Sequence, residues 1–211
     1  MKWRDLLQLV GGEPLFSSAL LRAGNVSDAQ VRLQLARWTT SGRIIQLRRG
    51  VYVLAPPYRK IEPHPFLIAN HLRKNAYVSL QSALAYHGLI PEYVPVVTSV
   101  TAARPEQVQT PIGVYIFKHM KLKLLFGYQE VEVSRNQHAL VATPEKALLD
   151  LIYLTSGAEQ ATYLRELRLQ NCESIDRSTL IEFAGRFGKP KLQRAAKNIF
   201  RILDQEVYEE L

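Results

Sequence analysis

Arginine and glutamine side chains gather in the first quarter of the chain, at positions where their chemistry suits nucleic acid. A glutamine can make two hydrogen bonds to adenine, and an arginine can make two to guanine or hold a phosphate. We predict that a helix and a hairpin present these side chains to duplex DNA. The predicted DNA-binding set is Gln30, Arg32, Gln34, Arg37, Arg43, Arg48 and Arg49.

Two carboxylates, Glu130 and Glu132, are two residues apart and so lie on one face of a predicted strand. They are the best candidates for catalysis. Such a pair can hold Mg²⁺ for phosphodiester chemistry. No Gly-Ser helix start precedes them to bind a triphosphate. We therefore interpret them as a solvated strand face. A metal-dependent nucleic-acid enzyme that uses Glu130 and Glu132 is the least favoured alternative.

Other catalytic and metal-binding patterns are missing from the sequence. The five histidines show no His-x-x-x-His spacing, and the single cysteine, Cys172, excludes an internal disulfide and a cysteine-based zinc site. No glycine-rich phosphate loop and no Gly-x-Ser-x-Gly turn is present. We expect no enzyme activity, no catalytic residue, no bound metal and no cofactor.

Three predicted helices position the first part of the basic set. Apolar residues at i, i+3, i+4 and i+7 between Trp3 and Val10 indicate an amphipathic helix. Ser17 is expected to cap a short second helix, and Gly24-Asn25 to turn the chain. Ser27 is expected to cap a third helix that ends near Ser41. The third helix then carries the glutamines.

A predicted hairpin follows these helices and carries the remaining arginines. Two β-rich runs, 43–47 and 51–54, flank an Arg-Arg-Gly turn. Three helices and a hairpin within residues 1–58 are typical of a winged helix-turn-helix domain. In that arrangement the third helix enters the major groove and the hairpin, the wing, contacts phosphates or the minor groove. The competing interpretation is a winged-helix module for protein interaction.

Net charge supports the nucleic-acid interpretation because it is concentrated in one segment. The 211-residue chain carries +8, and residues 1–60 hold ten Lys and Arg residues against three acidic residues. A compact basic segment attracts polyanions, because each neutralised phosphate releases condensed counterions.

A second domain is expected over residues 59–211, after a proline-rich connection at 55–65. Strand-like and helical runs alternate up to about residue 155, and Thr143-Pro144-Glu145 has the residue types of a helix start. We interpret Glu145, close to Lys146 and Asp150, as a first-turn acid. Ser79 is expected to cap another helix. The segment 144–209 is predicted to be helical, so the fold class is α+β: a winged helix-turn-helix, then a mixed α/β domain with a helical C-terminal third.

The distribution of apolar residues along the chain bears on the cell compartment in which the protein works. No apolar run approaches 18 residues, and the N-terminus lacks the apolar stretch of a signal peptide. We expect a cytoplasmic protein that has no membrane as a partner.

Four segments of the sequence resemble the AbiEi-type antitoxins of type IV toxin–antitoxin systems. The strongest is the run from Tyr77 to Glu92, which reads YVSLQSALAYHGLIPE. The others are 48–52, 97–101 and 143–151, the last of which reads TPEKALLDL. The resemblance covers residues 1 to about 155.

The resemblance implies a function as well as a fold. Members of this family repress their own operon by binding inverted repeats through an N-terminal winged helix-turn-helix. Their second domain counters a nucleotidyltransferase-type toxin, without a stable complex being required. The resemblance therefore implies operator DNA as a partner, a functional and indirect toxin partner, and two copies of the chain on two half-sites. The alternative is a winged-helix regulator whose second domain senses a ligand or a protein partner.

Overall fold

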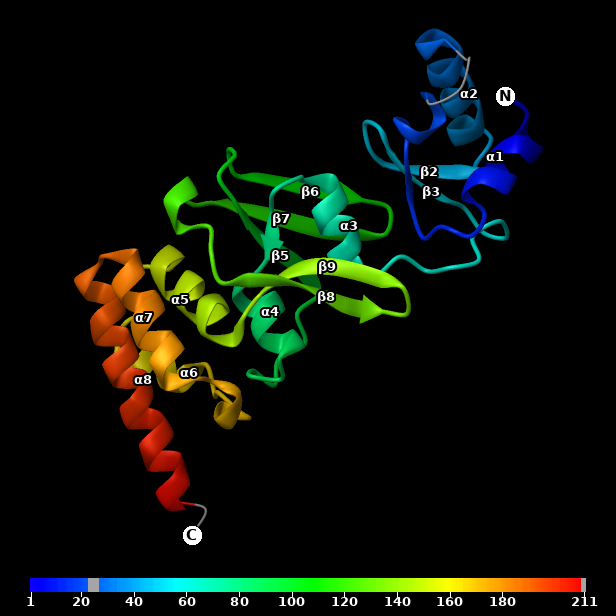
Figure 1. Cartoon of the computed structure of the whole chain (residues 1–211). Coiled ribbons are helices and arrows are strands. Elements are labelled where there is room, and N and C mark those ends of the chain that lie inside the picture. Colours follow the sequence, from blue (N-terminus) through cyan, green and yellow to red (C-terminus); the bar gives the residue numbers. More distant parts are fainter. Residues whose placement is uncertain (23–26, 210–211) are drawn as a thin grey trace.

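The computed structural model describes residues 1–22 and 27–209 and arranges them as two units joined by an extended segment (Figure 1). The N-terminal unit, blue to cyan in Figure 1, holds the basic helix and hairpin. The second unit has a mixed sheet at its centre, and its last helices lie at the end remote from the N-terminal unit. The fold class is therefore α+β, as predicted.

The N-terminal unit has the element order of a winged helix. Its three strands form a sheet in the order β1-β3-β2, with both pairs antiparallel. Its elements are α1 (Trp3–Val10), β1 (Phe16–Ser17), the 3-10 helix η1 (Leu20–Arg22), α2 (Asp28–Thr40), β2 (Ile44–Arg48) and β3 (Val51–Leu54).

The core of this unit forms because the apolar positions of α1 and α2 face the sheet. Leu6 and Val10 of α1 are completely buried, and Val31 and Leu35 of α2 are nearly so. Trp38 completes the inner face of α2. This spacing of three and four residues is the one from which the two helices are predicted, and the structure confirms both helices.

The prediction that Ser17 caps a second helix is wrong. Phe16 and Ser17 form a short strand instead, in which Ser17 pairs with Val51 of β3. Phe16 is buried and stacks on Tyr52 at 5.7 Å. The helical segment begins later and is a single 3-10 turn, η1. The predicted turn at Gly24-Asn25 lies outside the described residues.

A six-stranded sheet with the order β6-β7-β5-β4-β9-β8 forms the centre of the second unit. The central strand β4 is antiparallel to β5 and parallel to β9, and β5 is parallel to β7. The strands are β4 (Tyr77–Val78), β5 (Val96–Thr101), β6 (Glu106–Thr110), β7 (Gly113–His119), β8 (Tyr128–Ser134) and β9 (Gln137–Ala142).

Helices accompany this sheet and form the last third of the chain. Helix α5 is capped as predicted, because the Thr143 side chain accepts the Lys146 N–H at 3.4 Å and Pro144 takes the first position. The helices are α3 (Pro65–Leu72), α4 (Leu80–Tyr86), η2 (Leu122–Leu124), α5 (Pro144–Leu154), α6 (Ala161–Glu166), η3 (Cys172–Ser174), α7 (Arg177–Phe187) and α8 (Pro190–Glu209).

The two units also touch one another directly. Leu15, Leu47 and Val53 of the N-terminal unit belong to the same buried hydrophobic cluster as the core of the second unit. The connecting segment is fixed to β9 through Gln137, whose side chain accepts the His64 N–H at 2.7 Å and donates to the Glu62 carbonyl at 3.0 Å. The N-terminal unit is therefore packed on the second one and is not merely tethered to it.

Candidate nucleic-acid interface

Helix α2 has an outer face of mostly apolar side chains flanked by polar ones. Successive helical residues are about 100° apart around the axis, so Ala29, Leu33, Ala36 and Thr40 lie opposite the buried face. Leu33 is 51% exposed, although it is apolar. Methyl groups on this face can contact the methyl group of thymine.

The polar residues predicted on α2 lie on two flanks of that face. Gln30, Gln34 and Arg37 follow the i, i+4, i+7 spacing of one flank. Arg32 lies about 160° from Gln34 around the helix axis and so belongs to the other flank. Gln30, Arg32 and Arg37 are exposed, and Gln34 is half-buried. The sequence prediction treats Gln30, Arg32 and Gln34 as one group, but the helical geometry divides them.

Four arginines of the predicted set are exposed and have no acidic partner within residues 1–22 and 27–209. They come from α2, from the base of the hairpin and from its tip. They are Arg32, Arg37, Arg43 and Arg49.

Arg43 is held in place by an aromatic stack. Its guanidinium lies 5.4 Å from the centre of the Trp3 ring, and Trp3 packs edge-on against Trp38 at 5.3 Å. A cation over an indole face is attracted by the ring quadrupole and keeps its hydrogen-bond donors available. The base of the hairpin is thus fixed to both helices of the N-terminal unit.

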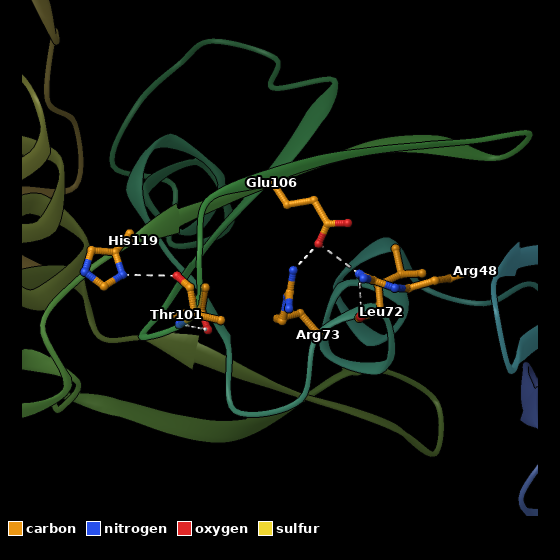
Figure 2. A network of polar contacts seen from close by, with 7 residues as sticks. Arg48, Leu72, Arg73, Thr101, Glu106 and His119 are labelled. Atoms are coloured by element: carbon orange, nitrogen blue, oxygen red, sulfur yellow. Dashed lines mark hydrogen bonds and ion pairs between the residues drawn. The ribbon is translucent and has the colours of Figure 1, made fainter.

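The side chain of Arg48, a predicted DNA contact, is held by the second unit and does not lie free on the wing. Figure 2 shows its side chain directed at the second unit. It pairs with Glu106 at 3.0 Å and donates to the Leu72 carbonyl at 3.3 Å. Glu106 also pairs with Arg73, whose guanidinium lies 5.7 Å from the Phe117 ring centre. The wing is therefore docked on the edge strand β6.

This docking could not be foreseen, because β6 is not predicted from the sequence. The strand reads EQVQT and contains a single large apolar residue, Val108. Polar composition is common in edge strands, where it discourages pairing with other chains. Without that strand, Glu106 has no predicted place and Arg48 has no predicted partner.

The glutamate pair on β8 is exposed, as the strand-face interpretation expects. Glu132 accepts the Asn136 N–H at 2.8 Å and so takes part in its own hairpin turn. Glu130 lies on the solvent side of β8. Within residues 1–22 and 27–209, no three His, Cys, Asp or Glu side chains converge as a metal site would require.

A buried polar cluster in the second unit is missing from the sequence prediction. Asp150 and Lys146 of α5 are both completely buried and form an ion pair. Asp150 also accepts hydrogen bonds from the Tyr77 hydroxyl and the Ser79 hydroxyl, each at 2.8 Å. Ser79 is the N-cap residue of α4, as predicted, but its hydroxyl is directed to the carboxylate and makes no capping hydrogen bond.

Burial sets the protonation energetics of this cluster. It raises the pKa of Asp150, while the Lys146 charge and the donated hydrogen bonds act in the opposite direction. It lowers the pKa of Lys146, against the pull of Asp150. Burial and the nearby Asp150 raise the pKa of Tyr77 above its ordinary range. Since Lys146 and Asp150 are sealed from solvent, the cluster organises the core. An i, i+4 Lys–Asp pair inside an apolar helix is the signal that could have found it.

No helix in the described parts of the chain is long and apolar enough to cross a membrane.

Comparison with known proteins gives a likeness among solved structures. No protein-family model matches the chain, and no curated protein is similar to it. Among solved structures, the chain is similar to the RV2827C protein from Mycobacterium tuberculosis, with a TM-score of 0.52 and 14% identity over 92% of this chain and 76% of that one. A likeness at this identity shows a shared fold alone.

Proposed function

We propose that this chain is a DNA-binding repressor that also acts as an antitoxin, in the cytoplasm of its cell. The observation that carries the DNA-binding half is the exposure of Arg32, Arg37, Arg43 and Arg49 on α2 and the hairpin, without acidic partners in the described residues. Solvated arginines can each replace a counterion of the DNA backbone.

The salt dependence of binding tests this half. We suggest measuring the affinity for the duplex upstream of its own gene by fluorescence anisotropy over a salt series. The double variant Arg43→Ala, Arg49→Ala should reduce the slope of log K against log salt by up to about 2, since each phosphate contact contributes about 0.9.

The matched control for this experiment removes the same charge elsewhere. Arg165 of α6 and Arg201 of α8 are exposed and lie among the C-terminal helices. The double variant Arg165→Ala, Arg201→Ala should change the slope little. An equal change in both double variants would mean that net charge alone acts, and the proposed interface would be rejected.

We assign the recognition of the DNA base sequence to Arg32 and Gln34, which lie on the two flanks of α2. Arg32→Ala and Gln34→Ala should each weaken binding to the operator by about 1–3 kcal/mol, the energy of a bidentate base contact. They should weaken binding to a scrambled duplex of equal length much less. Equal losses on both duplexes would reassign these residues to phosphate contacts.

The antitoxin half is supported by the resemblance of the second domain to AbiEi-type antitoxins. The two longest segments that carry it, 77–92 and 143–151, meet in the fold through the hydrogen bonds from Tyr77 and Ser79 to Asp150. The test is co-expression with the neighbouring gene. If that gene encodes a nucleotidyltransferase that arrests growth, this chain should restore growth. A toxic neighbour that it does not counteract would overturn the antitoxin half and leave the repressor.

A further inference from the structure

A hollow of about 580 Å³ lies on the second unit, between the start of α3, the outer side of α4 and the segment 90–95. Volumes of about 300–1,000 Å³ are usual for small-molecule sites. The floor is apolar: Ile90 and Val97 are each only 7% exposed. None of the residues of the proposed DNA interface lines this hollow, so it is a separate feature.

Aromatic rings form one wall of the hollow. The His64 and Phe66 rings lie 5.0 Å apart and nearly perpendicular, and the Phe66 and Tyr86 rings lie 5.7 Å apart. A further ring, that of Tyr93, is 88% exposed although it lines the same hollow. The Phe66 and Tyr86 rings are tilted by 56°, and a planar ligand ring can join such a cluster in offset or perpendicular stacking.

The polar groups of the hollow include a donor, the Nε2–H of His64, and an acceptor, the carboxylate of Glu92. The Phe66 N–H donates to Nδ1 of His64 at 3.2 Å, so that nitrogen carries a lone pair. Burial lowers the pKa of His64, which favours the neutral ring with its proton on Nε2. Glu92 contributes a carboxylate, and its charge is balanced by the ion pair with Arg168. The lining therefore suits an uncharged ligand with both acceptor and donor atoms.

We propose that this hollow binds a planar, uncharged heteroaromatic small molecule. The rings of Tyr86 and Phe66 favour a planar ligand. His64 can donate to an acceptor atom of that ligand, and Glu92 can accept from a donor atom. The site touches the connection between the two units, because His64 is at the end of the connecting segment and its N–H is fixed by Gln137. Binding of such a molecule does not depend on the proposed function.

Ligand-observed saturation-transfer NMR on the full chain tests this proposal, with adenine as the probe. Cyclohexanecarboxamide, which is similar in size and has a donor and an acceptor but no aromatic ring, is the matched control compound. Adenine should bind, and the saturated compound should bind at least about fivefold more weakly, since it cannot stack on the aromatic rings.

Variants locate the binding. Tyr86→Ala should weaken adenine binding at least about fivefold. Tyr128→Ala on β8 should not, although Tyr128 is 39% exposed against 40% for Tyr86. Tyr93→Ala removes a ring that is 88% exposed and so decides the matter if Tyr86→Ala fails to fold. Three results would each overturn the proposal. They are no binding of adenine, equal binding of the saturated compound, and equal losses in Tyr128→Ala and the hollow variants.

Discussion

At the scale of single residues, the cluster around Asp150 shows how one carboxylate can organise a core. It gathers an ammonium from its own helix and two hydroxyls from the strand β4 and the residue that follows it. Each donor is satisfied only because the other elements are in place. A buried pair of this kind contributes little net stability when intact, but it is costly to break on one side.

Removing the charge of Asp150 should therefore destabilise the fold. Asp150→Asn leaves the Lys146 ammonium buried without a counter-charge, and we expect a loss of about 3–5 kcal/mol in the free energy of unfolding, measured with urea. Adding Lys146→Met should restore part of the loss, because no unpaired charge remains. If the double variant is as unstable as the sum of the single ones, the two residues do not interact. Glu92→Gln, which breaks an exposed pair, should change little.

Asp176, the N-cap residue of α7, gives the stability of the fold a pH dependence at the same scale. Its carboxylate accepts hydrogen bonds from the Ser178 hydroxyl and the Thr179 N–H, which hold its pKa at about 2, against 3.8 in an unstructured chain. A pKa lowered by folding means that the carboxylate stabilises the native state above about pH 4 and loses this effect as the pH falls towards 2.

The variant Asp176→Asn isolates this effect. Its urea midpoint should lie below that of the parent chain at pH 6, and the difference should shrink steadily between pH 4 and pH 2. The reason is that the asparagine cap does not titrate and keeps its contacts in acid. A difference that stays constant over this range would show that the cap carboxylate does not contribute through its charge.

At the scale of elements, an ion pair joins the wing to the edge strand β6. Glu106 binds one arginine from β2 and one that follows α3, so two guanidinium groups are partly neutralised where the two units meet. The Arg48 and Glu106 side chains are 35% and 33% exposed, so solvent screens this pair. The contact fixes the wing, and it also withholds two cations from any polyanion.

Glu106→Gln should release both cations. If the chain binds DNA as proposed, affinity should rise, and the slope of log K against log salt should become steeper by up to about 2, because Arg48 and Arg73 can then contact phosphates. Glu130→Gln is the matched control, since it removes one exposed acid from the opposite edge strand of the same sheet, β8. An equal rise in both variants would assign the effect to net charge.

At the scale of the whole molecule, the two units share buried apolar contacts. Leu47 and Val53, which come from the wing strands, are only 5% and 0% exposed because they join the cluster of the second unit. Units that share buried apolar surface lose stability together when that surface is exposed. The N-terminal unit should therefore unfold together with the second unit.

The tryptophans make this coupling measurable. Both of them, Trp3 and Trp38, lie in the N-terminal unit, so their fluorescence reports on that unit, whereas far-UV circular dichroism reports mainly on the helices of the second unit. The two urea transitions should coincide. In Leu47→Ala the fluorescence transition should move to lower urea than the dichroism transition, and in Leu33→Ala, an exposed position, it should not. Separate transitions in the parent chain would contradict the coupling.

The larger elements could be predicted from the sequence because their causes are local. The spacing of apolar residues predicts α1 and α2, and the residue types of a helix start predict α5. The side chains of Ser27 and Thr143 cap two of these helices as expected. The strand at Phe16–Ser17 and the polar strand β6 could not be predicted, because each exists only through its partner strand.

The positively charged side chains of the N-terminal unit, and the helix and hairpin that carry them, follow from the sequence alone, since charge and periodicity are properties of neighbouring residues. Which of these charges stay exposed was decided by the tertiary structure. Arg48 and Arg49 are adjacent in sequence, yet Arg48 pairs with an acid 58 residues away and Arg49 is exposed to solvent. Likewise, Lys146 and Asp150 became a buried pair only because strand β4 and helix α5 meet. Contacts between residues far apart in the chain depend on how the elements pack, and no local pattern records that.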